Sequence, residues 1–545
     1  MSDDVITSYG GPPPAPPPGN RRRKLWMAAG VAGLTGVVGL AALGGITARD
    51  QRSGDQDRAS DTQPAAVPKQ DTDGDPARTG EDVNASGTGW KGSGDRPGAT
   101  QPGRPVPCDS DELIQAIEHA NNNHGGTLEL AKRCTYELTR SDAGDGTGPN
   151  GLPVITQAIV LTGHETKIVR AANADPFRIL NVGRNGHLTL KNVIVKGGLT
   201  TADLIGTPPA PVELSGRPTA TRAAAPEAAA PKAATTARAV AAPAPGVSGV
   251  STLVDAGPAD GAGILVQRGG HADLEHAEFV LHHAGGNGGA IANYGTARLA
   301  HGLVEASSAG EVGGGVFNAS VLRVEESKIT GNSAGAGGGV GNGVPSLDGS
   351  GGGGTFWAWK STISHNRATG TAGGVLNYRG TTTLAQSEVH DNHSGQDGGG
   401  LVSVGDGQLA LEQVRVAGNT ADYTAGGVAV GVGSTAVIER STIKDNVAEQ
   451  SGGGLATFGG TTVLRDSKVV ANRVVGLASV GGGIFSDGGQ VRLERSKVAD
   501  NFSVLPPGGI YTDNEGVEID RDSAVTGNRP TNCLGSPVVP ERCFG

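Results

Sequence analysis

Short runs in which apolar and polar residues alternate recur throughout the second half of the chain. One such run covers residues 491–496, where Val491 and Leu493 alternate with charged residues. A period of two is typical of β-strands that bury one face. Clusters of Gly, Asn and Asp separate each run from the next. The pattern therefore predicts many short strands joined by tight turns.

These strands belong to a repeat of 24 to 29 residues. Each repeat has a cluster of small residues, mostly glycines, followed by an aliphatic residue. The aliphatic residues are Ile264, Ile291, Val316, Val340, Val375, Leu401, Val428, Leu455, Ile484 and Ile510. The interval from Val340 to Val375 is longer, at 35 residues, because it contains a glycine-rich loop at 341–354. Short strands with this period fit one turn of a parallel β-helix, whose coils stack about 4.8 Å apart.

An asparagine closes each of the later repeats and forms a second regular series. Its members are Asn332, Asn366, Asn392, Asn419, Asn446, Asn472, Asn501 and Asn528. A serine stands five residues before every member except Asn419, where the residue is Val414. Equivalent positions of successive coils lie above one another in a β-helix. We therefore expect the asparagine side chains to form a hydrogen-bonded ladder along the rod and to fix the turn.

The region before the first coil has a helical pattern. Asp109 and Glu112 have the spacing of a capping box, and the apolar residues that follow lie on one helix face. The open ends of a solenoid pair with other chains unless they are covered. We therefore expect a short capping helix over the first coil and a second cap at residues 532–543. Residues 105–545 are predicted to form one all-β domain.

Segments outside the repeat differ from it in composition. Residues 1–24 are rich in proline and end in a basic run, while residues 25–48 are weakly apolar, carry no charge and are long enough to cross a bilayer. We expect 25–48 to act as a signal peptide or membrane anchor, which leaves the N-terminus inside and exports the rest. The linker at 49–104 and an insertion at 200–260 match the composition of disordered segments.

Composition and charge limit the possible functions. Glycine accounts for 92 of 545 residues and aromatic residues for only 3%, which argues against a globule with a large aromatic core. The net charge is -10 and no basic patch stands out in the second half. Nucleic acid is therefore not an expected partner, since phosphate binding needs a basic patch. We expect a monomer.

All four cysteines lie beyond the expected membrane segment, as in proteins of oxidising compartments. We expect Cys108 to pair with Cys134 and Cys533 with Cys543, because each pair brackets one end of the repeat region. Two other pairings are possible, and a zinc site is an alternative, although neither pair has C-x-x-C spacing. This cysteine usage agrees with a secreted or cell-surface protein, which residues 25–48 would anchor if they are not cleaved.

Two tryptophans stand close together on one predicted strand. Relative to Ser361, the alternation points Trp357 and Trp359 outward. Side chains two positions apart on a strand are about 7 Å apart, so the two rings suit a flat platform that stacks on sugars. In the alternative interpretation, the loop at 341–354 folds over them as a small satellite core.

Charged residues also follow the repeat. Stacking places Glu439, Arg465 and Glu494 in one outward column, where opposite charges on neighbouring strands attract. Other candidates for chemistry occupy turns of different coils; they are Asp397, Asp406, Asp422, Asp513, His282, His283, His390 and His393. The sequence shows neither the adjacent carboxylates nor the acidic column that polysaccharide hydrolases and calcium-dependent lyases need. We therefore expect no catalytic residue, metal site or cofactor, and interpret the aspartates as parts of solvated turns.

Several motifs resemble a known family. The segments at 108–117, 125–130 and 134–138 resemble the opening of exported bacterial right-handed parallel β-helix repeat proteins with a CSLREA-like N-terminal cap. With the glycine and serine–asparagine repeats, the resemblance covers about residues 105–545. It implies a right-handed parallel β-helix (solenoid) and names no activity. A fainter likeness to polymorphic outer-membrane proteins rests on Gly-Gly-Ala-Ile at 288–291, but the FxxN element of their repeats is absent.

Together these patterns predict an exported β-helix protein at the bacterial cell surface that binds polysaccharide or another surface and is not an enzyme. Trp357 and Trp359 are the expected ligand-binding residues. A polysaccharide lyase or glycoside hydrolase is the alternative function, and a structural spacer between the cell and its surroundings is a further one.

Overall fold

The computed structural model describes residues 103–142, 146–201, 256–344 and 352–545. The expected N-terminal segments at 1–24 and 25–48 and nearly all of the linker at 49–104 lie outside the described residues. In the described stretches, no helix has both the length and the apolar character that a membrane crossing requires. Residues 202–255 of the expected insertion also lie outside them. The described β-helix resumes at Ala256, a few residues earlier than the sequence predicts.

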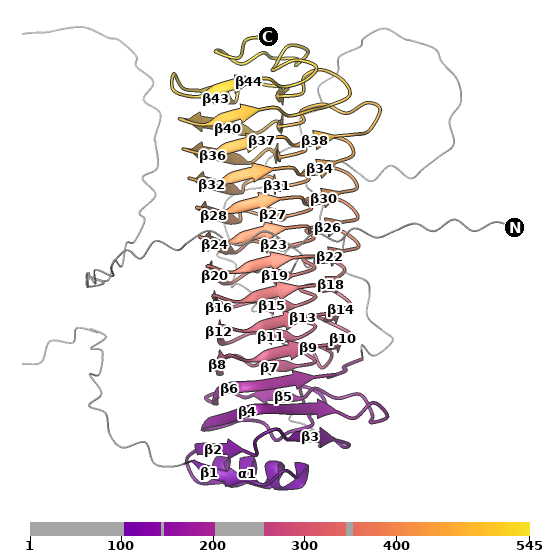
Figure 1. Ribbon diagram of the computed structural model, residues 1–545, viewed down its shortest axis with the longest axis vertical. Coiled ribbons are helices and arrows are strands. Elements are labelled where there is room, and N and C mark those ends of the chain that lie inside the picture. Colours follow the sequence, from indigo (N-terminus) through magenta and orange to yellow (C-terminus); the bar gives the residue numbers. More distant parts are fainter. Residues whose placement is uncertain (1–102, 143–145, 202–255, 345–351) are drawn as a thin grey trace, which may run out of the picture. The chain divides into compact units, whose positions relative to one another are not determined.

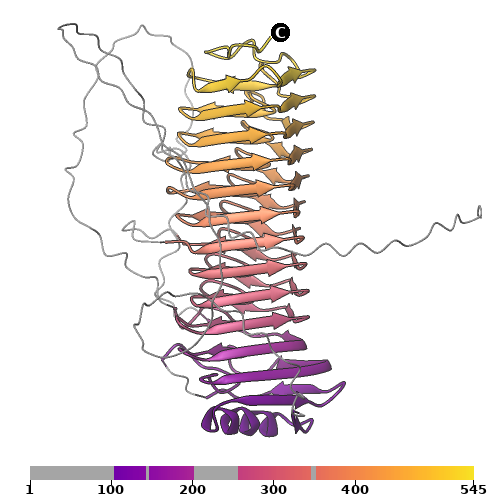
Figure 2. The same ribbon diagram turned by 90° about the vertical axis from the view of Figure 1, so that its left-hand side faces the viewer.

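The described residues form a parallel β-helix of three sheets, which confirms the predicted fold class. Each regular coil contributes two strands to a 25-stranded sheet and one to an 11-stranded sheet, and most coils add one to an 8-stranded sheet. Figure 1 shows the coils stacked from the indigo N-terminal end to the yellow C-terminal end. In the view of Figure 2, the strands of successive coils lie directly above one another.

The elements follow the repeat closely. The N-terminal part contains β1 (Arg104–Val106), α1 (Ser110–Asn122), β2 (Gly126–Leu130), β3 (Thr135–Leu138), β4 (Ala158–Arg170) and β6 (His187–Lys196). The first strands of the regular coils are β8 (His271–Glu275), β12 (Thr296–Ala300), β16 (Val321–Glu325), β20 (Thr355–Trp359), β24 (Thr381–Ala385), β28 (Gln408–Glu412), β32 (Thr435–Glu439), β36 (Thr461–Arg465), β40 (Gln490–Glu494) and β43 (Val517–Ile519). The second strands are β9 (Glu278–Val280), β13 (Leu303–Glu305), β17 (Lys328–Thr330), β21 (Thr362–Ser364), β25 (Glu388–His390), β29 (Arg415–Ala417), β33 (Thr442–Lys444), β37 (Lys468–Val470), β41 (Lys497–Ala499) and β44 (Ala524–Thr526).

The two smaller sheets complete each coil. The 11-stranded sheet contains β5 (Leu180–Val182), β7 (Ile264–Val266), β11 (Ile291–Asn293), β15 (Val316–Asn318), β19 (Val340–Asn342), β23 (Val375–Tyr378), β27 (Leu401–Val404), β31 (Val428–Val430), β35 (Leu455–Phe458), β39 (Ile484–Asp487) and β42 (Ile510–Thr512). The 8-stranded sheet contains β10 (His283–Ala284), β14 (Ser308–Ala309), β18 (Ser333–Ala334), β22 (Arg367–Ala368), β26 (His393–Ser394), β30 (Thr420–Ala421), β34 (Val447–Ala448) and β38 (Arg473–Val474).

The interior of the β-helix is one continuous apolar core. Alternate residues of each strand point inward, so that Val491 and Leu493 are buried while Arg492 between them is exposed. The same alternation buries Phe356 and Ala358 on β20. Full burial of one such aliphatic side chain contributes about 2 kcal/mol, and the stack repeats it in every coil.

The predicted asparagine series forms a buried hydrogen-bonded ladder. Asn446 shows the arrangement: its Nδ2 donates to Asn472 Oδ1 (2.9 Å) and to Val416 O (3.1 Å). Its Oδ1 in turn accepts from both the backbone N (3.0 Å) and Nδ2 (2.9 Å) of Asn419. Each amide thus satisfies backbone groups at the corner and its neighbours in two coils, which explains why the residue recurs.

A second ladder, which was not predicted, runs along the end of the 11-stranded sheet. Asn293, Asn318, Asn342 and Asn377 each donate from Nδ2 to the next member at 2.8 to 3.0 Å, and the series ends at Ser403 Oγ. All five side chains are buried. Their signal in the sequence is a polar residue two positions after the aliphatic residue in five consecutive repeats, from Ile291 to Leu401.

Both ends of the β-helix are capped as predicted. At the first coil, the Asp109 carboxylate accepts from Asp111 N (2.8 Å) and Glu112 N (3.2 Å) and begins α1, whose Leu113 and Ile117 are buried. A disulfide joins Cys108, which precedes the helix cap Asp109, to Cys134, which precedes β3.

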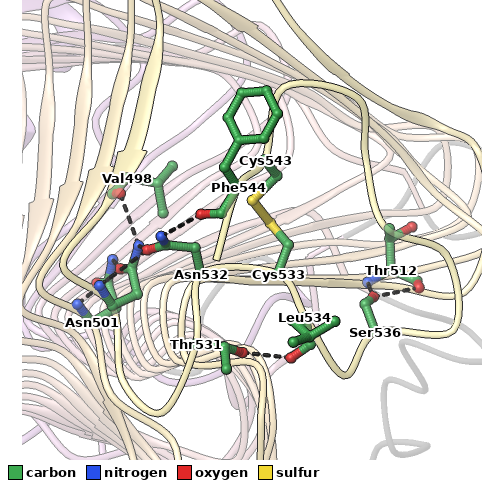
Figure 3. Close-up of a disulfide and its surroundings, with 11 residues drawn as sticks. Val498, Asn501, Thr512, Thr531, Asn532, Cys533, Leu534, Ser536, Cys543 and Phe544 are labelled. Atoms are coloured by element: carbon green, nitrogen blue, oxygen red, sulfur yellow. Dashed lines mark hydrogen bonds between the residues drawn. A yellow bond between two sulfur atoms is a disulfide. The ribbon is translucent and has the colours of Figure 1, made fainter.

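At the far end the asparagine ladder runs directly into the cap. Asn528 Nδ2 donates to Asn532 Oδ1 (2.9 Å), and Asn532 Nδ2 donates to Phe544 O (2.7 Å) beside the disulfide Cys533–Cys543 (Figure 3). Both expected disulfides are confirmed, and the alternative of a zinc site at the cysteines is wrong.

The three sheets differ in what covers their outer faces. Outward residues of the 11-stranded sheet, such as Phe317, Leu376 and Val402, are buried in a second apolar cluster with side chains of the preceding loops. Val312 is one of these loop side chains and packs closely against Gly341. A Cβ added at Gly341 would lie only 2.3 Å from Val312 Cγ1. Outward residues of the 25-stranded sheet are mostly exposed or half-buried. That sheet therefore presents the accessible strand surface on which a ligand can lie.

Candidate functional site

Charged side chains on the outer face of the 25-stranded sheet form ion pairs between coils. Arg465 contacts Glu439 (3.0 Å) and Glu494 (2.8 Å), in the column expected from the sequence. The hydrogen bonds that Arg465 donates to these two carboxylates raise the pKa of its guanidinium. Arg495 pairs with Asp466 at 2.8 Å, and this hydrogen bond lowers the pKa of the Asp466 carboxyl. These carboxylates are engaged in structural pairs and are not available for catalysis.

Two coils in the middle of the same sheet interrupt the charged pattern. The outward residues of β20 and β24 are Thr355, Trp357, Trp359, Thr381, Thr383 and Ala385, and they pair with one another in register. None of them carries a charge. The sheet thus has an uncharged patch two coils high between regions of ion pairs.

The two tryptophans are half-buried on the outer face of β20. The Lys360 ammonium lies 4.0 Å from the centre of the Trp359 ring, a cation–π contact that covers part of it. Among the described residues no such contact is made with Trp357, which lies between Arg323 and Thr383 in the strand register. Trp357 is therefore the ring better placed to stack on a sugar. Residues 345–351 of the loop in the alternative interpretation lie outside the described residues.

A cluster of His365, His390 and Asp391 lies at the corner that follows the second strands of the same two coils. Ligand atoms of the three side chains are all within 4.8 Å of one another. His390 Nδ1 is 2.7 Å from Asp391 Oδ2, and the two imidazole rings meet edge-on with centroids 5.7 Å apart. The His390 side chain is 23% exposed and that of Asp391 53%. A half-buried imidazole oriented by a carboxylate is a common arrangement for proton transfer.

The corner backbone sets the positions of this cluster. His365 and Asp391 occupy equivalent corner positions in successive coils, with φ of 56° and 54°. Gly418 holds the same corner in the next coil with φ of 65°. A Cβ at Gly418 would lie 2.6 Å from Asp391 Oδ1, so the glycine leaves space that the carboxylate uses.

Further ionisable groups surround the patch and the cluster. His393 Nε2 is 3.6 Å from Asp422 Oδ2, and Arg367 is the partner of His393 in the strand register. Arg323 and Lys328, on the coil below the tryptophans, are exposed, as is Arg367. None of these three cations has an ion-pair partner in the described part of the chain, in contrast to Arg465 and Arg495. The carboxylates that border the patch, Glu325 and Glu412, are instead held in ion pairs with Arg298 and Arg440.

The four aspartates considered in the sequence do not form a site. Asp406 and Asp513 lie in turns that lead into the 25-stranded sheet, whereas Asp397 and Asp422 lie in loops that lead into the 11-stranded sheet. Asp397 is the least solvated of the four: it is half-buried and accepts from Thr424 N at 3.1 Å. Its burial raises the pKa of the carboxyl.

The histidines also differ from the expected turn positions. His283, His390 and His393 lie on strands β10, β25 and β26. His282 is buried at the asparagine-ladder position of its coil: its Nδ1 accepts from Gly198 N (3.0 Å) and its Nε2 donates to Val195 O (3.0 Å). These bonds reproduce those of a ladder asparagine. Burial lowers the pKa of His282 to about 4.

Two members of the cluster, His365 and Asp391, were not among the residues that the sequence singled out. The signal that finds them is the ladder register. His365 immediately precedes Asn366 and Asp391 immediately precedes Asn392, so the two residues must lie above one another at one corner. His390, the residue before Asp391, then joins them.

Comparison with known proteins gives similar structures but no family. No family model and no curated protein matches the chain. The A-module of the Azotobacter vinelandii mannuronan C-5 epimerase AlgE6 is 13% identical, with a TM-score of 0.38, over 77% of this chain and 97% of the module. The AlgE4 A-module from the same organism is 13% identical, with a TM-score of 0.34, over 78% of this chain and 98% of the module.

These comparisons correct one expectation from the sequence. Both similar structures are modules of epimerases, which are enzymes, so the interpretation of this chain as a protein that is not an enzyme is withdrawn. At 13% identity the likeness assigns no substrate and no catalytic residue to this chain. What this chain shares with the two modules is the parallel β-helix fold.

Proposed function

We propose that this protein is an exported, carbohydrate-active β-helix that binds an acidic polysaccharide over β20–β25 and acts on it by proton transfer. The observation that carries the proposal is the conjunction on one open face of an uncharged aromatic patch and a His–His–Asp cluster, within two coils. Elsewhere on the same sheet, charged groups such as Arg465 and Arg495 are held in ion pairs. The proposal therefore places both binding and chemistry in the middle of the rod.

The tryptophans provide the binding surface in this proposal. A sugar ring stacks on the exposed face of Trp357 through its apolar C–H groups, in the way aromatic side chains bind flat apolar surfaces. From Trp359 to His365 the chain advances six residues, at most about 20 Å along the coil. A polysaccharide several units long can therefore contact the patch and the cluster together. Exposed Arg323, Lys328 and Arg367 favour a substrate with carboxylates.

The cluster supplies an acid–base pair. With Nδ1 of His390 held by Asp391, its Nε2 is the atom that takes a proton from the sugar carbon beside the carboxyl group. The C–H electron pair forms a double bond as the glycosidic C–O bond breaks, and the second imidazole, His365, protonates the leaving oxygen. The products are two shorter chains, one with an unsaturated end. Two imidazoles suit this elimination better than glycoside hydrolysis, which is commonly carried out by two carboxylates.

The two disulfides suggest an extracellular or secreted protein. We propose that residues 25–48 direct its export and that the CSLREA-like cap belongs to this exported architecture. The resulting location, secreted or at the cell surface, is where extracellular polysaccharides are met.

The experiment that tests the proposed function uses the purified full-length protein with acidic and neutral polysaccharides of plant, fungal and bacterial origin. Unsaturated ends are followed by ultraviolet absorbance, and inversion at the sugar carbon by NMR. Replacing both Trp357 and Trp359 by alanine should weaken substrate binding about 10-fold, the loss expected for aromatic stacking. Arg492→Ala, an exposed change on β40 of the same sheet, is the matched control. Unchanged binding by the double variant would refute the platform.

A further inference from the structure

We propose that His365, His390 and Asp391 also form a binding site for a divalent transition metal of the zinc class, and that the bound ion inhibits the enzyme. The inhibition rests on the proposed function, whereas the binding of the ion does not. The corner position of Asp391 also carries aspartate at Asp445 and Asp500, but among the described coils a histidine stands at this corner only at His365, and at the end of the second strand only at His390. Their meeting is a specific feature of two coils.

The three donors are close enough together to hold one metal ion. One ligand atom from each side chain lies within 4.8 Å of the other two, and this is the only such group of three in the described stretches. Metal–ligand distances near 2 Å place the donors of a tetrahedral ion a little over 3 Å apart, so small side-chain rotations complete the site. His365 and Asp391 are exposed and free to make them.

The chemistry of the three donors favours a transition metal. Two imidazoles and one carboxylate suit zinc and neighbouring first-row transition metals, whereas calcium and magnesium prefer sets of oxygen ligands. Three protein ligands leave at least one coordination position open. Glycines occupy the same corner in the coils below and above, at Gly331 and Gly418, so no side chain at these positions blocks access to the site.

A second His–His–Asp group in the same sheet provides an internal comparison. His187 Nε2 is 2.9 Å from Asp273 Oδ2, and the rings of His187 and His271 are 5.9 Å apart. The composition is the same, yet the three ligand atoms are not brought together as a group. The difference is that these residues point outward from strands, while His365 and Asp391 stack at a corner. His271→Ala is therefore a matched control.

Occupancy of the site interferes with the proposed chemistry. A metal ion takes the imidazole lone pairs, and His390 then has none with which to accept a proton from the sugar. The expected result is that zinc inhibits turnover and that a chelator restores it.

The test is isothermal titration of the tag-free, chelator-treated full-length protein with ZnCl2, with thermal unfolding as the control for folding. We expect one strong site per chain, weakened at least about 10-fold by His365→Ala or Asp391→Ala and unchanged in His271→Ala. Equal binding by all four proteins, or no binding by wild type, overturns the proposal. Binding is measured without substrate. An inactive protein that binds zinc at this site would refute the proposed function and leave the metal site standing.

Discussion

Two regions of the 25-stranded sheet have the same interior and different exteriors. In β32, β36 and β40, inward Ile438, Leu464 and Leu493 lie beneath a network of ion pairs centred on Arg465. In β20 and β24, inward Ala358 and Leu384 lie beneath tryptophans and threonines. The corner ladder is continuous through both regions. The repeat therefore determines the inside of each coil, and the outward positions are free to carry function.

The largest expected effect comes from replacing the histidines of the β20–β25 region. His365→Ala and His390→Ala should each lower turnover by roughly 10²- to 10⁴-fold, the range for loss of a general acid or base. Both side chains lie on the outer surface, so thermal stability should change little. Arg465→Ala, in the other region, should leave turnover unchanged. Initial rates and melting curves of the three variants measure turnover and thermal stability. Equal rates in all three would remove the functional distinction between the regions.

The second test asks whether the two interiors are equivalent. Asn392→Ala and Asn446→Ala should each lower the free energy of unfolding by about 3 to 4 kcal/mol, because either change leaves several buried hydrogen-bonding groups without partners. Denaturant unfolding of both variants measures the loss. A cost in one region more than twice that in the other would contradict a uniform interior.

The third test extends the comparison to the start of the ladder, where His282 takes the place of an asparagine. Its folded pKa of about 4 lies below the unfolded value near 6.5, so the unfolded chain binds more protons between these limits. Stability is complete above pH 6.5 and falls by about 3 kcal/mol as the pH drops to 4. Protonation of His282 Nδ1 would also bring two hydrogen-bond donors, this Nδ1–H and the Gly198 N–H, against each other.

His282→Asn is the matched variant, since an asparagine amide can make both ladder bonds. It should remove this part of the pH dependence, measured by urea unfolding at several pH values, whatever its effect on stability at neutral pH. The same slope in variant and wild type would show that another group titrates in this window.

The smallest effect concerns the ion pairs. Arg465→Ala should cost less than about 1 kcal/mol, because both of its contacts lie in partly exposed positions where water and salt screen them. The remaining cost should shrink further at high salt, as measured by melting temperature at two ionic strengths. A loss several times larger would mean that the exterior pairs help to determine the fold.

The sequence predicts the interior well because the interior is periodic. Glycine clusters, alternating strands, ladder residues such as Asn446 and the cap at Asp109 each follow from local geometry repeated in every coil. The second ladder, headed by Asn293, was missed because its asparagines are replaced by other residues in many repeats.

The site is harder to predict because it breaks the period. His365, His390 and Asp391 come from two coils and meet only when the register is applied to outward residues. The asparagine ladder gives that register, because His365 and Asp391 each stand immediately before a ladder asparagine. Aspartates such as Asp397 were candidates because of their residue type alone, and in the structure they lie in different turns.

The proposed function rests on proton removal from an acidic sugar by His390, on the β20–β25 face. The most direct measurement is turnover of a panel of polyuronates by the purified full-length protein, followed by ultraviolet absorbance and by NMR in D2O. We expect unsaturated ends on at least one polyuronate, none on neutral polysaccharides, and loss of the product in His390→Ala. A product made equally well by His390→Ala, or no elimination and no deuterium incorporation on any polyuronate, would contradict the proposed function.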